Sequence, residues 1–267
     1  MDLNGKIAIV TGGGTGIGRA TSLKLAKRGA HVAVNYRASR SEAEETAEAC
    51  RQLGVRAVAI AADVGSDKDC RQLVAAAEIK LGGNVGILVN NAAATKFVPH
   101  ARLDGLSDED FANIFRTNVT GAYQMIRAAV PGMRALGGGT VVNVASIAGL
   151  FGGGTCSAYA ASKAALINLT KTLARALAPD IRINAVCPGF VATRWFEDRM
   201  SPEDYAVALN EVTGAMPLGR APTPEDIAGG ITYFCSQDAA AITGETLIMD
   251  AGAHLDLAIS RRAVGRE

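Results

Sequence analysis

Seven short apolar runs, spread along a chain of 267 residues, constrain the fold more than any other feature of this sequence. Each run is nearly continuous in apolar residues rather than alternating with polar ones, which is typical of parallel strands buried on both faces. Segments of helical composition lie between them, among them residues 17–28, 41–53 and 67–81. Strands that alternate with helices predict right-handed crossovers and a doubly wound α/β sheet. The strand-like runs are residues 7–10, 31–35, 55–60, 87–89, 140–144, 181–186 and 246–249.

The composition suits one large apolar core. Apolar residues make up 49% of the chain, and basic and acidic residues nearly balance at a net charge of +1. A chain of this size can bury a single α/β core, so we expect residues 1–267 to form one domain. The balanced charge disfavours a nucleic-acid partner, which would need a clustered basic excess. Residues 190–217, less regular and rich in proline at their margins, are expected to form a substrate lid.

Cysteine, histidine and the N-terminal segment give no sign of metal binding, secretion or membrane insertion. The five cysteines include no C-x-x-C pair, and none of the three histidines is three or four residues from another. This usage is typical of a reducing compartment and predicts no structural metal site. The first residues lack the regions of a signal peptide, and no run reaches the about 18 apolar residues that span a bilayer. We therefore expect a cytoplasmic protein with no membrane and no metal partner.

A glycine-rich turn, T-G-G-G-T-G-I-G, follows the first strand and opens the first helix. Glycines let the backbone turn tightly and approach a ligand, and the free N–H groups of a helix start attract an anion. At the first strand–helix junction of a doubly wound fold, that anion is expected to be the pyrophosphate of a dinucleotide. A purely structural turn is the alternative, and the absence of a following G-K-[ST] disfavours a nucleotide triphosphatase. The cofactor-binding residues expected here are Thr11, Gly12, Gly14, Thr15, Gly16, Ile17 and Gly18.

The end of the second strand indicates which dinucleotide binds. An acidic residue there accepts from a free ribose 2′-hydroxyl, whereas an arginine favours a 2′-phosphate. The sequence reads Asn35-Tyr36-Arg37, with no acidic residue, and Arg37 offers a planar fork to phosphate. We therefore expect NADP(H) to be preferred, while NAD(H) stays possible if Arg37 is only a solvated loop residue. Asp63 and Val64, after the third strand, are expected to contact the adenine, although Asp63 also suits a helix start.

Tyr159 and Lys163 form a candidate proton-handling pair. They stand four residues apart in a helical segment and so share one helix face. A neighbouring ammonium lowers the pKa of a phenol, and a tyrosine tuned in this way can exchange a proton with an alcohol or alkoxide. This spacing alone is weak evidence because chance often produces it. Ser146 strengthens it, because it follows the fifth strand at the sheet edge where such folds bind ligands, although a turn serine is the alternative.

Together these motifs resemble the classical short-chain dehydrogenase/reductase family over nearly the whole chain. The glycine-rich turn is similar to the family's T-G-x-x-x-G-x-G, and residues 90–93 resemble its N-N-A-G, with Ala93 in place of glycine. Asn118, Ser146, Tyr159 and Lys163 resemble its catalytic tetrad. The resemblance implies a Rossmann-type seven-stranded parallel sheet in three αβα layers. It also implies these cofactor-binding residues: Asn91, Ala92, Ala93, Tyr159, Lys163, Pro188, Gly189, Val191 and Thr193.

The resemblance assigns a role to each member of the tetrad. Tyr159 would be the general acid/base, and Lys163 would lower its pKa and bind the nicotinamide ribose. Ser146 would orient the substrate, and Asn118 would hold a water that relays protons toward Lys163. The family usually forms tetramers through two long helices, here residues 108–135 and 157–178, and through the last strand, so the resemblance implies a homotetramer, with a homodimer as the alternative.

The expected substrate pocket lies between residues 95–97, residues 147–156 and the lid. Its candidate side chains are mostly apolar, which favours a carbonyl compound with apolar substituents. His100 is a further candidate, with an exposed loop histidine as the alternative. The expected pocket residues are Ser146, Phe97, Phe151, Cys156, Trp195 and Phe196.

These observations predict an NAD(P)H-dependent oxidoreductase that interconverts a carbonyl and a secondary alcohol. A more specific alternative is a 3-oxoacyl thioester reductase acting on acyl-carrier-protein or coenzyme A thioesters, for which Arg127, Arg134 and Arg175 would supply part of a docking patch. A lyase or epimerase is disfavoured because those relatives are generally longer. An alternative of another class is a non-catalytic regulatory protein that binds NADP(H).

Overall fold

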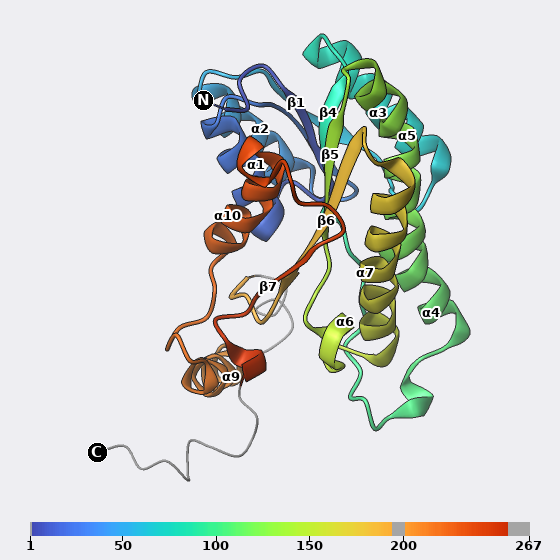
Figure 1. The fold of residues 1–267 in the computed structure, drawn as a ribbon. Coiled ribbons are helices and arrows are strands. Elements are labelled where there is room, and N and C mark those ends of the chain that lie inside the picture. Colours follow the sequence, from blue (N-terminus) through green and yellow to red (C-terminus); the bar gives the residue numbers. More distant parts are fainter. Residues whose placement is uncertain (1, 194–200, 256–267) are drawn as a thin grey trace.

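The computed structural model describes residues 2–193 and 201–255, and its centre is one seven-stranded sheet with all strands parallel. Helices cover both faces of this sheet, so the chain forms the three αβα layers expected from its sequence (Figure 1). The strands are β1 (Ile7–Val10), β2 (His31–Tyr36), β3 (Ala57–Ala61), β4 (Val85–Asn90), β5 (Gly139–Val144), β6 (Ile181–Pro188) and β7 (Thr246–Met249).

The strand order is β3-β2-β1-β4-β5-β6-β7, so the order reverses at β1. Ile9 pairs with Ala33 of β2 on one side and with Leu88 of β4 on the other. After β1 the chain forms β2 and β3 on one side of that strand. It then crosses back to form β4 on the other side of β1. Because the loops after these two strands diverge, a crevice opens between them at the carboxyl edge of the sheet, where doubly wound folds bind their ligands.

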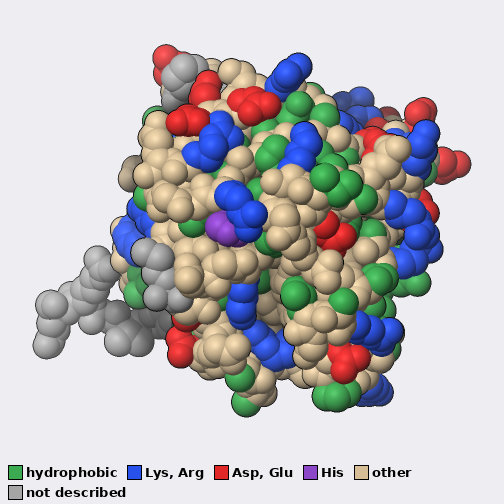
Figure 2. All heavy atoms as spheres, turned by 90° about the horizontal axis from the view of Figure 1, so that it is seen from above, with side chains coloured by type: hydrophobic (Ala, Val, Ile, Leu, Met, Phe, Trp, Pro, Cys, Tyr) green, Lys and Arg blue, Asp and Glu red, His purple; other side chains and the backbone are tan. Residues whose placement is uncertain are grey.

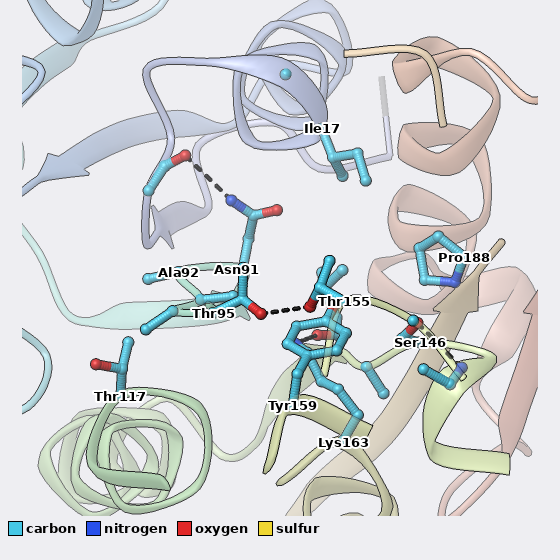
Figure 3. Close-up of a pocket in the computed structure, with 18 of the residues that line it drawn as sticks. Ile17, Asn91, Ala92, Thr95, Thr117, Ser146, Thr155, Tyr159, Lys163 and Pro188 are labelled. Atoms are coloured by element: carbon cyan, nitrogen blue, oxygen red, sulfur yellow. Dashed lines mark hydrogen bonds between the residues drawn. The ribbon is translucent and has the colours of Figure 1, made fainter. Parts of the chain in front are cut away.

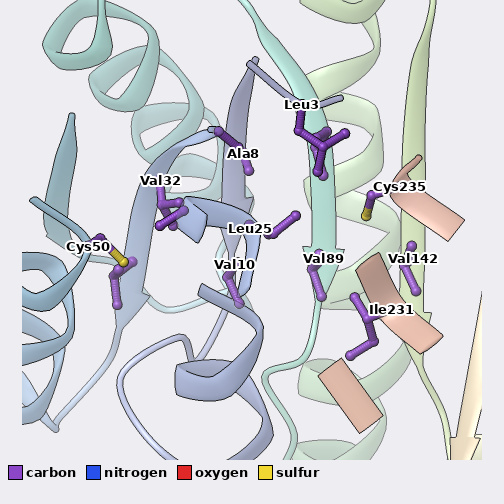
Figure 4. Close-up of a cluster of buried hydrophobic side chains, with 14 of the residues drawn as sticks. Leu3, Ala8, Val10, Leu25, Val32, Cys50, Val89, Val142, Ile231 and Cys235 are labelled. Carbon is purple, nitrogen blue, oxygen red and sulfur yellow. The ribbon is translucent and has the colours of Figure 1, made fainter. Parts of the chain in front are cut away.

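Two apolar layers attach the helices to the sheet. The side chains of α1, α2 and α10 pack on one face around Leu25 and Ile231 (Figure 4), and those of α3, α5 and α7 pack on the other around Leu73 and Met125. All five cysteines are free and buried within the fold. The helices of these layers are α1 (Gly16–Lys27), α2 (Arg40–Gln52), α3 (Asp67–Leu81), α5 (Ala122–Ala135), α7 (Ser157–Leu177) and α10 (Pro224–Cys235).

The first of the two long helices expected from the sequence, residues 108–135, is interrupted. It consists of α4 (Asp108–Phe115), a six-residue π-helical segment (Arg116–Gly121) and α5. A π-turn adds a residue to the helical repeat and turns the following side chains to a new direction. The interruption contains Asn118, so it lies at a residue already singled out for function. The remaining elements are α6 (Ala148–Phe151), α9 (Pro202–Ala215) and the 3₁₀ turns Leu103–Gly105, Gln237–Ala239 and Ala253–Leu255.

Across the part of the chain that the structure describes, every helix is too short or too polar to cross a membrane.

Close packing at the turn between β1 and α1 depends on Gly18. A Cβ atom at this position would lie 2.1 Å from the carbonyl oxygen of Gly12 and 2.6 Å from Nδ2 of Asn91. The start of α1 therefore lies directly against the strand ends, with no room for a side chain. Glycine is needed at this position because of the lack of space. Conformational freedom is not the reason, since the φ angle of Gly18 is not positive.

We predict that Gly18→Ala destabilises the fold by about 1–3 kcal/mol, the usual effect of overpacking. Gly214→Ala is the matched control, because a Cβ there meets nothing within 4 Å in α9 and the replacement should be neutral or slightly stabilising. Urea unfolding of the two variants and the native chain measures the difference. Equal free energies of unfolding for Gly18→Ala and the native protein would contradict the packing argument.

Candidate active site

A cavity of about 1070 Å³ opens at the carboxyl edge of the sheet. It extends along the ends of β1 to β6 and reaches the N-terminal half of α7. Most of the residues selected from the sequence line it, although they come from segments far apart in the chain. Those lining residues are Gly12, Thr15, Gly16, Ile17, Arg37, Asp63, Val64, Asn91, Ala92, Ala93, Phe97, Ser146, Tyr159, Lys163, Pro188, Gly189, Val191 and Thr193.

The N-terminus of α1 opens into this cavity without a side-chain cap. Thr15 occupies the N-cap position, yet its side chain makes no capping hydrogen bond. By contrast, Ser66, Ser107 and Thr223 cap the helices that they precede. Free N–H groups at a helix start carry partial positive charge and bind phosphate oxygens. Gly16, with a φ of +49°, brings the backbone to the cavity wall, so this end fits the pyrophosphate of a dinucleotide.

Three residues of the glycine-rich turn act behind the cavity wall rather than on it. The Thr11 hydroxyl accepts from the backbone N–H groups of Asn91 and Ala92 at 2.9 and 3.0 Å. A Cβ on Gly14 would lie 2.9 Å from the backbone nitrogen of Ala43, so Gly14 permits α2 to pack closely. Together with Gly18, these residues shape the turn. All three were expected to bind the cofactor, but none of them lines the cavity.

The outer end of the cavity is formed by the loops after β2 and β3. Arg37 is exposed there, and it forms no ion pair or hydrogen bond with any of the described residues. Asp63 also lines the cavity, while its carboxylate accepts from the N–H of Gly65 at 2.8 Å. Asp63 therefore shapes a turn and lines the cavity. It is not a helix-start residue, because α3 begins at Asp67 with Ser66 as its cap, and its contact with the adenine stays a prediction.

The inner end of the cavity brings Ser146, Tyr159 and Lys163 together (Figure 3). The Ser146 hydroxyl follows β5 and is hydrogen bonded to the Tyr159 side chain. Lys163 is buried one helical turn further along α7, with Nζ 5.5 Å from the centroid of the Tyr159 ring. Nζ donates to the carbonyl oxygen of Val144 at 2.8 Å. The ammonium is therefore directed toward the end of β5 while remaining on the cavity wall.

The pKa values at this end differ from the sequence-based expectation. Burial raises the pKa of Tyr159 to about 12, and the hydrogen bond from Ser146 opposes that increase only in part. Burial also lowers the pKa of Lys163 to about 8. The pKa of Tyr159 is thus raised rather than lowered in this structure, in which Lys163 is itself desolvated and bonded to Val144, and the tuning of Tyr159 by Lys163 stays a prediction. Tyr159 is therefore a neutral phenol, ready to donate a proton, at neutral pH.

Asn118 lies behind the main cavity, beside a small one of about 10 Å³. Its side-chain oxygen accepts from the N–H of Ala94 at 2.7 Å, and its amide donates to the Ala94 carbonyl at 3.0 Å and to the Ser162 hydroxyl at 2.9 Å. The Ser162 hydroxyl in turn donates to the Tyr159 carbonyl at 2.7 Å. The Asn118 side chain thus joins the loop after β4 to α7, and the water-relay role stays a prediction.

The substrate end of the cavity differs from the apolar pocket expected. Phe97 lines it, but Phe151 points away and stacks on His254, with ring centroids 5.9 Å apart. Cys156 is fully buried, and its sulfur accepts from the N–H of Tyr159 at the start of α7. Both residues were expected in the pocket and neither lines it. Trp195 and Phe196 lie outside the described residues.

The predicted lid is described only in part. Phe190, Val191 and Thr193 line the cavity, and α9 accounts for most of the remaining described residues of the range 190–217. Its role as a lid stays a prediction.

Several lining residues were missed by the sequence analysis. Asn35 is buried at the end of β2, where its amide oxygen accepts from the N–H of Gly12 at 3.3 Å. Its amide nitrogen donates to the Ala62 carbonyl at 3.1 Å, which joins the glycine-rich turn to the end of β3. A polar residue near the end of a run expected to be buried was the available signal. Thr95 and Thr155 fell within the expected pocket ranges, but neither was singled out.

Known proteins are similar to this chain in both sequence and fold. The family model described as enoyl-(acyl carrier protein) reductase matches residues 12–254. An L-rhamnose 1-dehydrogenase (NAD(P)(+)) of Sphingomonas sp. (strain SKA58) is 37% identical over 257 residues, which are 96% of this chain and 98% of the relative. Dehydrogenase/reductase SDR family member 4 of Mus musculus is 35% identical over 254 residues, 94% of this chain and 88% of the relative.

A solved structure of NAD⁺-bound xylitol dehydrogenase superposes with a TM-score of 0.86 at 31% identity, covering 94% of this chain and all of that one. These matches extend over nearly the full chain. The chain belongs to the short-chain dehydrogenase/reductase family, and the protein is an oxidoreductase of that family.

We predict that Lys163→Met loses stability relative to the native protein as the pH rises from 7 to 10. The pKa of Lys163 falls from 10.5 to about 8 on folding, so between these values the unfolded chain binds the proton and the folded chain does not. Native stability therefore gains about 2 kcal/mol from this group between pH 7 and pH 10, a gain that methionine lacks.

Urea unfolding of both proteins at several pH values measures the gap. Other groups also titrate in this range, but taking the difference between the two proteins removes their contribution. A stability gap that stays constant between pH 7 and pH 10 would show that the lysine is not desolvated as described.

Proposed function

We propose that this protein is an NADP(H)-preferring dehydrogenase/reductase that interconverts a carbonyl and a secondary alcohol. The observation that carries the proposal is the hydrogen-bonded pair Ser146 and Tyr159 at the inner end of a cavity whose other end fits a dinucleotide. When bound, the nicotinamide would exchange a hydride with the substrate carbon. The chain's own task is then to bind the substrate oxygen and to supply or take up its proton.

Tyr159 is proposed as the general acid/base and Ser146 as the residue that orients the substrate oxygen. The neutral phenol donates its proton to the oxygen as negative charge develops there, and the Ser146 hydroxyl shares the same oxygen. In the opposite direction the alcohol proton returns to Tyr159. Burial keeps the phenol protonated at neutral pH, so it is in the form that can act as the acid.

Lys163 and Asn118 support this pair in different ways. Lys163 lines the cavity, and the N–H groups that do not bind Val144 are proposed to bind the nicotinamide ribose. Asn118 acts as a positioning residue, because its side chain holds both the loop after β4 and Ser162 on α7. Other residues along the cavity wall are proposed to hold the cofactor: Gly12, Thr15, Gly16, Ile17, Asp63, Val64, Asn91, Ala92, Ala93, Pro188, Gly189, Val191 and Thr193.

The preference for NADP(H) rests on Arg37. β2 ends at Tyr36, and the lining residues directly after it are Arg37, Ala38 and Ser39, none of them acidic. The exposed guanidinium is proposed to bind the 2′-phosphate through two parallel hydrogen bonds. The relative that acts on L-rhamnose is named for both NAD⁺ and NADP⁺, so use of NAD(H) is kept as the alternative.

A 3-oxoacyl thioester substrate is the second candidate, because the matching family model is described by a substrate on an acyl carrier protein, although that substrate is an enoyl rather than a 3-oxoacyl group. Two of the three arginines expected to dock an acyl carrier protein argue against it, because acidic side chains of this chain already pair with them. Arg127 pairs with Asp67, and Arg134 pairs with Asp180 at the amino edge of the sheet, opposite the cavity. That face shows basic and acidic side chains side by side (Figure 2). Such mixed charge gives weak attraction for an acidic carrier protein.

We also propose a cytoplasmic homotetramer with neither nucleic-acid nor membrane partners. Phe111 on α4 and Tyr123 on α5 are large apolar side chains left exposed on the helices that the family resemblance assigns to the subunit interface. Burying them against a second copy would remove apolar surface from water.

We predict that Tyr159→Phe lowers kcat for carbonyl reduction by about 10²–10⁴-fold, because the variant cannot donate the proton. Tyr123→Phe, which removes an exposed hydroxyl from α5, is the control and should keep native activity. A panel of ketones with NADPH or NADH, followed at the absorbance of the reduced cofactor, gives the rates, and cofactor fluorescence gives binding. Native turnover by Tyr159→Phe would refute its role. Cofactor binding by the native chain without turnover of any ketone would favour the regulatory protein.

We predict that Arg37→Ala weakens NADPH binding by about tenfold or more, the loss expected for a charge-assisted phosphate contact, with little effect on NADH. Arg40→Ala is the matched control, because Arg40 is also exposed after β2 but does not line the cavity. Fluorescence titration of both variants with both cofactors measures the dissociation constants. Equal loss of NADPH and NADH affinity would remove Arg37 as the residue that binds the 2′-phosphate.

A further inference from the structure

Two threonine hydroxyls meet beside Tyr159 at the substrate end of the cavity. Thr95 follows β4 and Thr155 precedes α7, and their side chains point toward each other above the Tyr159 ring (Figure 3). Their Oγ1 atoms are hydrogen bonded to each other. Both residues line the cavity and both are half-buried. The pair is thus a polar contact placed where the sequence suggested an apolar wall.

The pair keeps hydrogen-bonding capacity for a ligand. A hydroxyl has one proton to donate and two lone pairs to accept. Thr95 has further partners in the Lys96 carbonyl at 3.3 Å and the Cys156 sulfur at 3.9 Å, whereas the Thr155 hydroxyl has Thr95 as its one hydrogen-bond partner among the described residues. Whichever of the two donates in their mutual bond, Thr155 retains at least one unused site on the cavity side.

The backbone fixes this hydroxyl close to the reacting centre. A Cβ on Gly154 would lie 3.4 Å from Cδ1 of Tyr159, so the residue before Thr155 lies against the tyrosine ring. The Thr155 carbonyl accepts from the N–H of Val98 at 2.9 Å, and the His100 ring nitrogens lie 3.2 Å from the Gly154 carbonyl oxygen and from the Ser157 hydroxyl. The loops after β4 and before α7 are therefore held together, with the hydroxyl pair between them.

We propose that Thr95 and Thr155 bind a hydroxyl group on the carbon next to the reacting one, so that the substrate is an α-hydroxy carbonyl compound, or a vicinal diol in the reverse direction. This inference rests on the proposed function, since it assumes a carbonyl held by Ser146 and Tyr159. A plain alkyl group in the same place would cover the Thr155 hydroxyl without satisfying it, which is unfavourable for a polar group leaving water. A site that binds a substrate hydroxyl discriminates strongly against the analogue without it.

The test compares 2-hydroxycyclohexanone with cyclohexanone as substrates for NADPH-dependent reduction. The native enzyme is expected to favour the hydroxyketone in kcat/KM by about tenfold or more. Thr155→Val keeps the shape of the side chain and removes its hydroxyl, so it should lose most of that preference while cyclohexanone turnover stays close to native. Thr155→Ser restores a hydroxyl and should restore the preference. Thr172→Val, an exposed change on α7, is the matched control and should change neither substrate.

Each outcome separates this inference from the proposed function. Reduction of both ketones without a preference, or an equal loss of both in Thr155→Val, would overturn the role of the threonine pair and leave the dehydrogenase/reductase assignment intact. Reduction of neither ketone by the native enzyme with NADPH bound would overturn the proposed function, and this inference with it. A higher kcat/KM for a 3-oxoacyl thioester than for the hydroxyketone would replace the hydroxylated substrate class with the acyl one.

Discussion

The contact between Thr11 and Asn91 is the one on which the arrangement of the site depends. Asn91 donates from its side chain to the backbone carbonyls of Thr11 and Gly12 at 2.9 and 3.1 Å, and its own N–H donates to the Thr11 hydroxyl. These bonds join the ends of β1 and β4, where the strand order reverses. These hydrogen bonds fix the positions of the two strand ends at the base of the crevice. The glycine-rich turn and the loop after β4 therefore keep one relative position, and both walls of the cavity are built outward from it.

A short series of hydrogen bonds leads from the joined ends of β1 and β4 to Tyr159. Ala94, three residues past Asn91, is bound on both its N–H and its carbonyl by Asn118, and Asn118 also binds Ser162 on α7. Ser162 bonds the Tyr159 backbone. The distance between the cofactor end and the phenol is thus set by buried polar contacts rather than by apolar packing alone, and such contacts tolerate little displacement. The π-helical segment makes this possible, because it turns Asn118 toward the loop and α7 together.

The sequence predicted the framework well and the substrate end poorly, for a physical reason. Strand and helix positions follow from local apolar patterns, and the glycine-rich turn follows from contacts within a few residues. The direction of the Phe151 side chain does not follow from such local patterns, because it depends on stacking with His254, which is far from it in the sequence. The π-helical interruption is equally invisible, since one added residue barely changes the apolar pattern of residues 108–135. The pKa of Tyr159 depends on burial and on the direction of Lys163, which residue spacing does not reveal.

The loop before α7 shows how the same framework can change its substrate. Gly152, Gly153 and Gly154 all have φ angles near +80°, a conformation that other residues rarely adopt. These three glycines direct the chain away from Phe151 and place Thr155 beside Tyr159. The aromatic ring is therefore left outside the cavity, and a hydroxyl lies where a bulky apolar side chain would otherwise be expected. Ser146, Tyr159 and Lys163 are held by β5 and α7 and need not move when this loop changes. The positions of the candidate catalytic residues thus depend on the sheet and on α7, while the polarity of the cavity beside them depends on a loop whose backbone path favours glycine.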